Sequence, residues 1–331
     1  MSGAVVHTHT QASEAVTAAP ATIRGLRVRE HEVLAPYTTY KIGGPARWLL
    51  EIEARAAVAP ALAVLAQHGI RWHVLGNGSN VLVADRGFDG AIVHLAAGGE
   101  LDRLALVRDA RGAGQHTLEA GAGVSVTRLL RTAKDEQLGG LWVLGGVPGT
   151  VGGAVRMNAG TRWGDLGSVL EAAEVADVTG ARWWPTRELG LAYRHAALPP
   201  QAIVTGARFA VGDADEATRG KLDEVLAHRR ATQPLQVPSC GSVFANPPGD
   251  AAGRLIEAAG LKGTIIGGAQ ISAQHANWIV NLGGASAADV RALMDAATRA
   301  VKAQFGVTLR AEAQLLGDWD AGATRADGGA R

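Results

Sequence analysis

The sequence predicts an α+β fold that is divided into two or three packed units. The chain has 331 residues, more than the ~100–200 residues of a usual domain. Four predicted strands between residues 117 and 210 surround a glycine-rich segment. The last predicted helix is followed directly by an alternating strand. Strands and helices are therefore both expected to contribute to the cores.

The hydrophobic pattern places the individual elements along the chain. Helices are expected at residues 56–68, 126–134 and 221–230, and Gly69 is expected to end the first of them. Strands are expected at residues 38–44, 46–52, 70–75, 81–83, 91–95, 117–120, 170–177, 181–184 and 203–210. A domain boundary is expected near residues 211–216, where the character of the chain changes.

The last helix carries the clearest signals in the sequence. Ser286 and Asp289 form a capping box, and an apolar stripe then continues until Gly306. Residues 307–315 alternate strictly between apolar and polar side chains, which predicts a strand. The alternation points Glu312 away from the core, toward either solvent or a cleft.

Composition and charge exclude several classes of protein. A net charge of +1 without a Lys/Arg run gives no extended surface for nucleic acid or an anionic membrane. The longest mostly apolar run, residues 56–66, is too short to span a bilayer. Residues 1–22 lack the pattern of a signal peptide and are expected to be a disordered tail. The single cysteine, Cys240, excludes an internal disulfide and is expected to be a small buried side chain. A cytoplasmic protein without a metal site is expected.

Two glycine-rich segments are candidates for binding a ligand. Residues 144–160 hold six glycines in seventeen residues with almost no charge. Such a segment is either a cradle in which amides approach a flat or anionic ligand, or a tight loop buried between sheets. Residues 76–80 follow a predicted strand and form a turn whose short side chains and amides suit a phosphate.

Two Gly-x-Gly segments, at residues 76–78 and 121–123, do not fit a Rossmann dinucleotide site. Gly76-Asn77-Gly78 begins like that fingerprint, but strands follow where the fingerprint requires a helix. Residues 121–123 precede a helix, yet Val126 occupies the position of the third glycine and no acidic partner is evident.

Taken alone, the remaining candidates have ordinary interpretations. Arg194 fits a solvated surface arginine, and Ser242 fits a turn hydroxyl. Taken together, the motifs resemble those of the UDP-N-acetylenolpyruvoylglucosamine reductase (UDP-N-acetylmuramate dehydrogenase, MurB) family. The matching segments occur in family order at residues 40–47, 75–80, 148–160, 193–194, 241–244 and 276–281, and at Glu312.

The resemblance implies a two-lobed FAD-binding fold of the vanillyl-alcohol-oxidase type, followed by a small α+β substrate domain. The implied division is a tail at residues 1–23, a first FAD-binding lobe at 24–95, a second at 96–212, a substrate domain at 213–319 and a flexible tail at 320–331. It also implies the shorter subtype, without the inserted tyrosine loop, because 48 positions separate Arg194 from Ser242. A monomer is expected.

The implied reaction is an NADPH-dependent step of peptidoglycan synthesis, and thus of cell-wall biogenesis, cell shape and cell division. Hydride passes from the flavin to C3 of an enolpyruvyl ether, and charge develops at C2. By resemblance, Arg194 holds the carboxylate and stabilises the enolate, Ser242 protonates C2, and Glu312 orients or polarises that end of the substrate.

The resemblance also implies a binding residue set. FAD would be held non-covalently by Ile42, Gly43, Gly76, Asn77, Gly78, Ser79, Asn80, Gly123, Pro148, Gly149, Thr150, Gly153, Ala154, Asn158, Ala159, Gly160 and Val204, with its pyrophosphate on the amides of residues 77–80 and of the glycine-rich segment. Tyr193, Arg229, Asn246 and His275 would line the substrate site. Ala245 stands where many relatives carry Lys or Arg, and Arg156, Arg162 and Trp163 have no implied role.

Two other functions fit parts of the pattern. One is another FAD-dependent alcohol or sugar oxidoreductase of the same fold, although the glycine-rich segment holds no histidine that could attach a flavin. The other is a non-catalytic protein that binds a nucleotide sugar. The presence of Arg194, Ser242 and Glu312 together argues against the second, because binding alone does not need all three.

Overall fold

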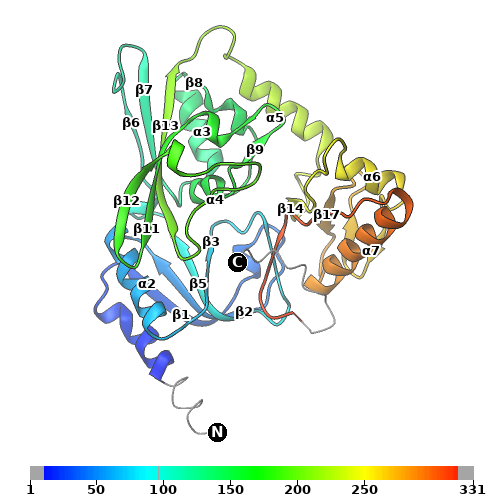
Figure 1. Ribbon diagram of the computed structural model, residues 1–331, viewed down its shortest axis with the longest axis horizontal. Coiled ribbons are helices and arrows are strands. Elements are labelled where there is room, and N and C mark those ends of the chain that lie inside the picture. Colours follow the sequence, from blue (N-terminus) through cyan, green and yellow to red (C-terminus); the bar gives the residue numbers. More distant parts are fainter. Residues whose placement is uncertain (1–10, 96, 320–331) are drawn as a thin grey trace. The chain divides into compact units, whose positions relative to one another are not determined.

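The computed structural model describes residues 11–95 and 97–319, and its main chain divides into two compact units. Among the described residues, unit 1 consists of residues 11–30, 48–79 and 90–236 apart from 96. Unit 2 consists of residues 31–47, 80–89 and 237–319. Each unit is therefore assembled from stretches that are far apart in the sequence (Figure 1).

The first sheet has four strands in the order β1-β2-β5-β3. These strands are β1 (Leu26–Val33), β2 (Pro45–Ile52), β5 (Phe88–Leu95) and β3 (Trp72–Leu75). Helix α2 (Val58–Gln67) connects β2 with β3, and Gly69 follows its end at φ +60°, as predicted. The β3–β5 pair is parallel, and Leu75 is the last residue of β3 before the turn at residues 76–79.

The second sheet of unit 1 is antiparallel and has the order β12-β11-β13-β7-β6. Its strands are β6 (Leu104–Val107), β7 (Gln115–Gly121), β11 (Leu170–Asp177), β12 (Gly180–Pro185) and the long β13 (Ile203–Asp213), which also pairs with β8 (Leu138–Gly139). The predicted strand at 170–177 has the observed bounds. A separate two-stranded hairpin joins β9 (Gly160–Thr161) and β10 (Gly164–Asp165).

One hydrophobic core joins the two sheets of unit 1. Leu50 and Leu62 from the first sheet and its helix belong to the same buried cluster as Leu118 and Phe209 from the second. Helix α2 contacts β11, so it packs against the second sheet. Burial of such side chains contributes ~1.5–3 kcal/mol each, which makes this shared core the main stabilising feature of unit 1.

Three further helices belong to unit 1. They are α3 (Val126–Asp135), α4 (Val151–Arg156) and α5 (Lys221–Thr232). Ser125 caps α3, because its hydroxyl accepts a hydrogen bond from the N–H of Arg128. Helix α4 packs on β13 and β7 (Figure 1).

Short 3₁₀ helices occur in both units, at η1 (Ala19–Ala21), η2 (Ala35–Tyr37), η3 (Arg55–Ala57), η4 (Glu100–Asp102), η5 (Leu141–Leu144), η6 (Leu166–Ser168) and η7 (Thr186–Glu188).

The prediction of a disordered N-terminal tail is wrong for residues 11–23. Residues 11–18 are helical, and η1 follows directly. Val16, Ala19 and Ile23 are buried in the core of unit 1. The weak helical pattern of this Ala/Thr-rich stretch is stabilised by tertiary packing, which often decides the structure of such a segment. The first ten residues of the expected tail and the tail expected at 320–331 lie outside the described residues.

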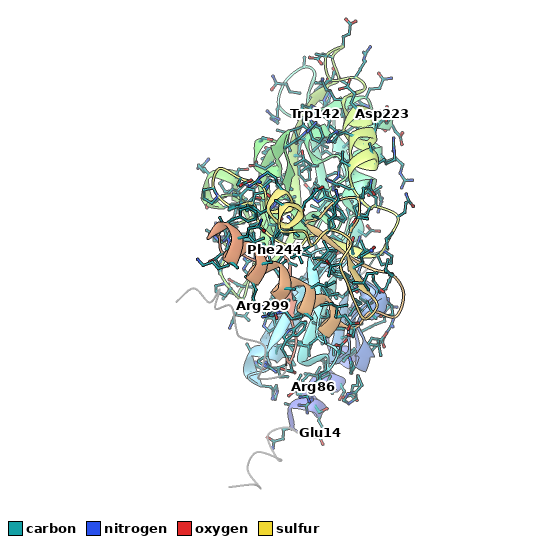
Figure 2. All side chains as sticks on the ribbon, turned by 90° about the vertical axis from the view of Figure 1, so that its right-hand side faces the viewer. Glu14, Arg86, Trp142, Asp223, Phe244 and Arg299 are labelled. Carbon is teal, nitrogen blue, oxygen red and sulfur yellow. The ribbon has the colours of Figure 1, made fainter. Side chains whose placement is uncertain are left out.

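Unit 2 is built on a small sheet of the order β14-β17-β16-β15. Its strands are β14 (Ser239–Ser242), β15 (Ile265–Ile266), β16 (Ala269–Ile271) and β17 (Trp278–Asn281), and its helices are α6 (Ala252–Ala258) and α7 (Ala287–Phe305). Strands β4 (Val81–Val83) and β18 (Gln314–Leu316) form a parallel pair. Phe244, labelled in Figure 2, is buried in the core of this unit with Tyr40, Leu255 and Leu293.

The capping box of α7 is confirmed. The Ser286 hydroxyl accepts from the N–H of Asp289, and the Asp289 carboxylate accepts from the N–H of Ser286. Gly306 ends the helix in the left-handed conformation at φ +71°. The carboxylate of Asp85 also accepts from the N–H groups of Ala287 and Ala288, the first two residues of the helix.

Two predicted strands are wrong. Residues 38–44 form turns and irregular chain, because Thr38 Oγ1 donates to the Ile42 carbonyl and closes the segment on itself. Residues 307–315 are a strand only from Gln314 onward, with one isolated bridge at Ala311. The polar positions of the alternation do avoid the core, but Ala311, which was expected to be buried, is exposed.

Candidate active site

The two glycine-rich segments meet in unit 1. A Cβ atom at Gly76 would lie 2.6 Å from Oγ1 of Thr150, and a Cβ atom at Gly149 would lie 2.5 Å from Oγ of Ser79. The turn at residues 76–79 therefore lies directly against residues 149–150, and only glycine permits this approach. Among the described residues, no protein acceptor takes the main-chain N–H of Asn77 or Ser79. These N–H groups can receive an anionic ligand.

The glycine-rich segment is a short helix rather than an open cradle. Thr150 is the N-cap of α4, and the N–H groups of Val151 and Gly152 donate to the carbonyls of Val124 and Ala122. A Cβ atom at Gly152 would lie 2.9 Å from the Cβ atom of Ala122. This glycine therefore allows α4 to pack closely against the turn that follows β7. Residues 144–160 were expected to be either a cradle for a ligand or a tightly packed segment. Within this range α4 is tightly packed, whereas the turn before α4 can still be approached by a ligand.

Several main-chain groups of the predicted cofactor residues bond within the protein. The N–H groups of Ala154, Asn158 and Ala159 donate to carbonyls of residues 150, 155 and 154. The Asn158 side chain is also engaged, because Nδ2 donates to the Ala192 carbonyl and Oδ1 accepts from the N–H of Gly167. Gly153 donates its N–H to Oγ1 of Thr150.

The other predicted cofactor residues occupy both units. In unit 1, Gly123 lies close to the carbonyls of Leu101 and Leu95, and Val204 is a buried residue of β13. Pro148 is exposed. In unit 2, Ile42 is buried in the core, and Gly43 packs against Val83. Asn80 Nδ2 donates to the Glu312 carbonyl at 3.1 Å.

Arg194 lies at the tip of a tight turn in unit 1. The main chains of Ala192 and His195 exchange hydrogen bonds across this turn, and Arg194 adopts a left-handed φ of +56°. Its Nη2 donates to the Gly160 carbonyl at 3.0 Å, and its guanidinium lies 5.0 Å from the centre of the Tyr193 ring. A non-glycine residue in this conformation is held by its surroundings. Tyr193 is more than half exposed.

Arg229 on α5 belongs to the same part of unit 1. Its side chain packs on Gly146, where a Cβ atom would lie 2.7 Å from Cδ of the arginine, and Nη1 donates to the Gly145 carbonyl at 3.4 Å. Burial, with a further contribution from the positive charge of Arg194, lowers the pKa of Arg229 to about 10. Its buried Nε has no hydrogen-bond partner among the residues that the structure describes. Two neighbouring guanidinium groups of this kind have the charge and the donors to bind an anion.

Ser242 and Glu312 come together in unit 2. Ser242 ends β14 opposite Trp278 of β17, and the next residue, Val243, accepts the N–H of Glu312 at 2.9 Å. An isolated bridge between Phe244 and Ala311 continues this pairing. Both side chains are partly exposed. Within the part of the chain that the structure describes, the Ser242 hydroxyl has no hydrogen-bond partner, so it is free to donate to a ligand.

Asn246 and His275, the remaining predicted substrate residues, are also in unit 2. Asn246 Oδ1 accepts from the N–H of Ala252 at the start of α6. His275 Nδ1 accepts from the N–H of Asn277, and burial lowers the pKa of this histidine. Asn277 itself bridges to Phe244 through both of its side-chain atoms. These hydrogen bonds fix the segment that follows Ser242 and join it to residue 277.

Cys240 is a buried side chain, as predicted, and its partner Tyr40 was not predicted. The Tyr40 hydroxyl donates to the Ile279 carbonyl at 2.9 Å and contacts the Cys240 thiol. Burial raises the pKa of Cys240 to about 12, with a smaller contribution of the same sign from the Glu312 carboxylate. A thiol with this pKa is not a nucleophile near neutral pH.

The buried thiol predicts a loss of stability in alkali. In the unfolded chain the thiol titrates near its ordinary pKa of 9.0, and in the folded chain it stays protonated until about pH 12. The stabilising contribution is therefore complete below pH 9 and is lost as pH rises, by about 1.4 kcal/mol per pH unit. Between pH 9 and 10, urea unfolding followed by circular dichroism should show a steeper loss for the native chain than for Cys240→Ala. Equal slopes would contradict this prediction.

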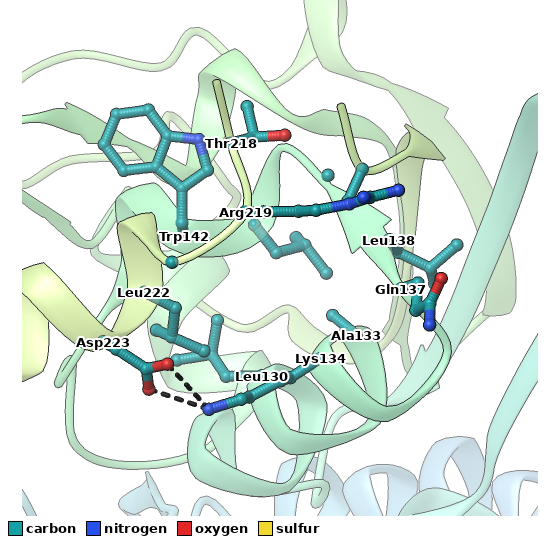
Figure 3. Close-up of a pocket in the computed structure, with 14 residues that line it drawn as sticks. Leu130, Ala133, Lys134, Gln137, Leu138, Trp142, Thr218, Arg219, Leu222 and Asp223 are labelled. Atoms are coloured by element: carbon teal, nitrogen blue, oxygen red, sulfur yellow. Dashed lines mark hydrogen bonds and ion pairs between the residues drawn. The ribbon is translucent and has the colours of Figure 1, made fainter. Parts of the chain in front are cut away.

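A separate pocket lies at another end of unit 1. It encloses about 340 Å³ and is walled by apolar side chains of α3, η5 and α5, among them Leu130, Trp142 and Leu222. An ion pair between Lys134 and Asp223, at 2.8 Å, lies at its edge (Figure 3). None of the residues that line this pocket belongs to the predicted flavin or substrate set.

The described residues hold neither a metal cluster nor a membrane-spanning helix. No group of three or more His, Cys, Asp or Glu side chains there is arranged to hold a metal ion. No helix within residues 11–95 and 97–319 is both long and apolar enough to cross a membrane.

Comparison with known proteins decides the family. The family model described as FAD binding domain matches residues 47–184, and the model described as UDP-N-acetylenolpyruvoylglucosamine reductase, C-terminal domain, matches residues 233–316. The UDP-N-acetylenolpyruvoylglucosamine reductase of Myxococcus xanthus is 42% identical over 306 residues, which cover 92% of this chain and 97% of the relative. The chain belongs to the UDP-N-acetylenolpyruvoylglucosamine reductase family.

Further members of the reductase family agree in sequence and in structure. UDP-N-acetylenolpyruvoylglucosamine reductase 2 of Symbiobacterium thermophilum is 43% identical, over 88% of this chain and 92% of that protein. The crystal structure of the enzyme from Thermus caldophilus matches with a TM-score of 0.74 and 39% identity, and the match covers 88% of this chain and 99% of that one. The predicted α+β, FAD-binding fold class is therefore confirmed.

Proposed function

We propose that this chain is an FAD-dependent, NADPH-consuming reductase that converts UDP-N-acetylglucosamine enolpyruvate to UDP-N-acetylmuramate during peptidoglycan precursor synthesis. Family membership over more than nine-tenths of the chain supports the activity. The observation that carries the proposal is the pairing in unit 2 of a free Ser242 hydroxyl with the segment that bears Glu312. This pairing places an O–H donor and a carboxylate on adjacent segments.

The residues of unit 1 fit FAD. The turn at residues 76–79 offers two N–H groups that no described residue accepts, and it lies against Thr150 at a distance that only glycine permits. We propose that Asn77 and Ser79 hold the pyrophosphate, and that Gly76, Gly78, Pro148, Gly149, Thr150 and Val204 line the rest of the cofactor site with the other predicted residues. Main-chain N–H groups thus take the place of lysines in binding the phosphates.

When bound and reduced by NADPH, FAD supplies the hydride that goes to C3 of the enolpyruvyl group. Arg194 holds the carboxylate of the substrate through its guanidinium, which carries a permanent charge and a planar pair of donors. The same group stabilises the negative charge that develops next to that carboxylate. Arg229, which is partly buried and has an unpaired Nε, adds a second positive charge for an anionic part of the substrate.

Ser242 delivers a proton from Oγ to C2 in this proposal. A serine hydroxyl is a weak acid, so this transfer needs a strongly basic carbon and close placement. The β14–β17 pairing and the Val243–Glu312 hydrogen bond, which fix the main chain around Ser242, support this proposal. Glu312 orients the substrate, and Tyr193, Asn246 and His275 are proposed to line its nucleotide-sugar portion.

The test is to follow the two half-reactions of the purified protein separately without oxygen. We expect a yellow protein whose flavin absorbance is bleached by NADPH and restored by the enolpyruvyl substrate. Restoration by oxygen but not by that substrate would instead support an FAD-dependent oxidase of the same fold. A colourless protein that cannot be reconstituted with FAD would leave only a non-catalytic nucleotide-sugar-binding protein.

Three further predictions from the sequence belong to this proposal. We propose that the enzyme is monomeric, that it acts in the cytoplasm, and that it is of the shorter subtype without the tyrosine loop. The 48 positions between Arg194 and Ser242 support the last of these. The proposed lobes at residues 24–95 and 96–212 and the proposed substrate domain at 213–319 stay predictions.

A further inference from the structure

Two guanidinium groups of unit 1 are each held by a glycine carbonyl. Arg194 donates to Gly160 at the start of the β9–β10 hairpin, and Arg229 donates to Gly145 just after η5. The positive charge of Arg194 acts on Arg229, and because like charges repel, contacts that fix the two side chains also hold the two groups near each other. The distance between the two groups therefore depends on how the hairpin, η5 and α5 are held together.

One direct link joins the hairpin to η5. Thr161 Oγ1 donates to the Val143 carbonyl at 3.0 Å and also accepts the N–H of Trp163. A side-chain hydrogen bond of this kind contributes modestly to stability. It attaches strand β9 of the hairpin to the segment that holds Arg229.

A second link joins the tip of the hairpin to α5. The Trp163 indole meets the His228 imidazole edge to face, with ring centroids 5.5 Å apart and planes at 89°. His228 immediately precedes Arg229 on the helix. The Arg162 guanidinium also lies over the indole, 4.4 Å from the ring centre. Edge-to-face pairs of aromatic rings are a favoured arrangement.

We propose that the Trp163–His228 contact positions Arg194 and Arg229 relative to each other, and that Trp163 is therefore a positioning residue for the anionic substrate. The contact joins the segment that holds one guanidinium to the helix that carries the other. A ligand with an anionic group between the two arginines is bound best when they are correctly spaced. This inference rests on the proposed reductase function, because the substrate supplies the anion.

The test compares Trp163→Ala with Trp163→Phe. We expect Trp163→Ala to raise both the KM for the enolpyruvyl substrate and its Kd for the oxidised enzyme, measured by titration calorimetry, by about tenfold. The flavin content and the rate of flavin reduction by NADPH should stay unchanged. Trp163→Phe keeps an aromatic edge near His228 and should recover most of the affinity.

A matched control is Trp183→Ala. Trp183 is another tryptophan of unit 1 that is covered by an arginine, because the Arg208 guanidinium lies 3.9 Å from its ring centre. It has no contact with the hairpin among the described interactions, so its removal should leave KM and Kd at native values. An equal rise in this control, or a native Kd in Trp163→Ala, would overturn the positioning role.

The outcome is separable from that of the proposed function. If the native enzyme neither binds nor reduces the enolpyruvyl substrate, the proposed function fails. If the native enzyme turns over normally and Trp163→Ala does so with the same KM and Kd, only the positioning role fails. If Trp163→Ala does not fold, as seen by circular dichroism, His228→Leu decides. It should weaken substrate binding without changing flavin reduction, while Trp163→Phe keeps most of the affinity, and native affinity in His228→Leu would refute the role.

Discussion

Replacing Ser242 with alanine should slow the reoxidation of the reduced flavin by the enolpyruvyl substrate by ~10²–10⁴-fold, the usual contribution of a positioned general acid. The reason is that no other described group offers an O–H donor on this part of β14. Reduction of the flavin by NADPH should stay at the native rate, since it does not need the proton that Ser242 delivers. Stopped-flow absorbance of the flavin under anaerobic conditions measures both steps.

The control for this experiment is Ser239→Ala. Ser239 lies on the same strand but is buried and pairs with Val280, so the variant tests whether any change in β14 slows reoxidation. Its effect should be much smaller. Equal slowing of both half-reactions in Ser242→Ala would exclude the hydroxyl as the proton donor and assign it a binding or structural role.

Replacing Gly149 with alanine should cause the second large effect, a loss of flavin. The new Cβ would lie 2.5 Å from Oγ of Ser79, and the residue would be held at φ +98°. The backbone strain costs ~1–3 kcal/mol, and relief of the clash moves Ser79 away from the proposed pyrophosphate position. We expect the Kd for FAD, measured by quenching of flavin fluorescence, to rise at least about tenfold.

Gly98→Ala separates the effect of backbone strain from the effect of the clash with Ser79. Gly98 has a similar φ of +87°, but nothing lies within 4 Å of the added Cβ. This variant should share the backbone strain, seen as a lower melting temperature, and keep native flavin affinity. Flavin affinity that falls equally in both variants would show that strain alone, and not the contact with Ser79, weakens binding.

Local signals in the sequence predicted the parts of the fold that depend on neighbouring residues. The capping box of Ser286 and Asp289 and the left-handed Gly306 each depend on residues of a single helix. Both predictions are confirmed. The burial of Cys240 was also predicted, from its small apolar character. The resemblance located Ser242 and Glu312 on separate segments, but only the structure shows that Val243 and Glu312 pair.

The features that sequence could not predict depend on tertiary partners. Helix α4 contains Gly152 and Gly153, which disfavour a helix by ~1 kcal/mol each, and it forms because Gly152 packs on Ala122 of the core. Residues 11–18 likewise become helical where Val16 is buried. The left-handed conformation of Arg194 has no sequence signal, since a glycine or asparagine is usual there. Trp163 and His228 are 65 positions apart, and no local pattern joins them.

The parallel pair of β4 and β18 has a consequence for how the chain acquires its structure during translation. Val81 of β4 leaves the ribosome about 230 residues before its partner Gln314, which corresponds to roughly 10–50 s of synthesis. Until then, β4 and the segment at residues 31–47 have no completed unit 2 in which to be buried. Their apolar side chains, including Tyr40 and Leu82, are therefore exposed to aggregation and to chaperones for most of translation, while the long-range pairing delays the last folding step.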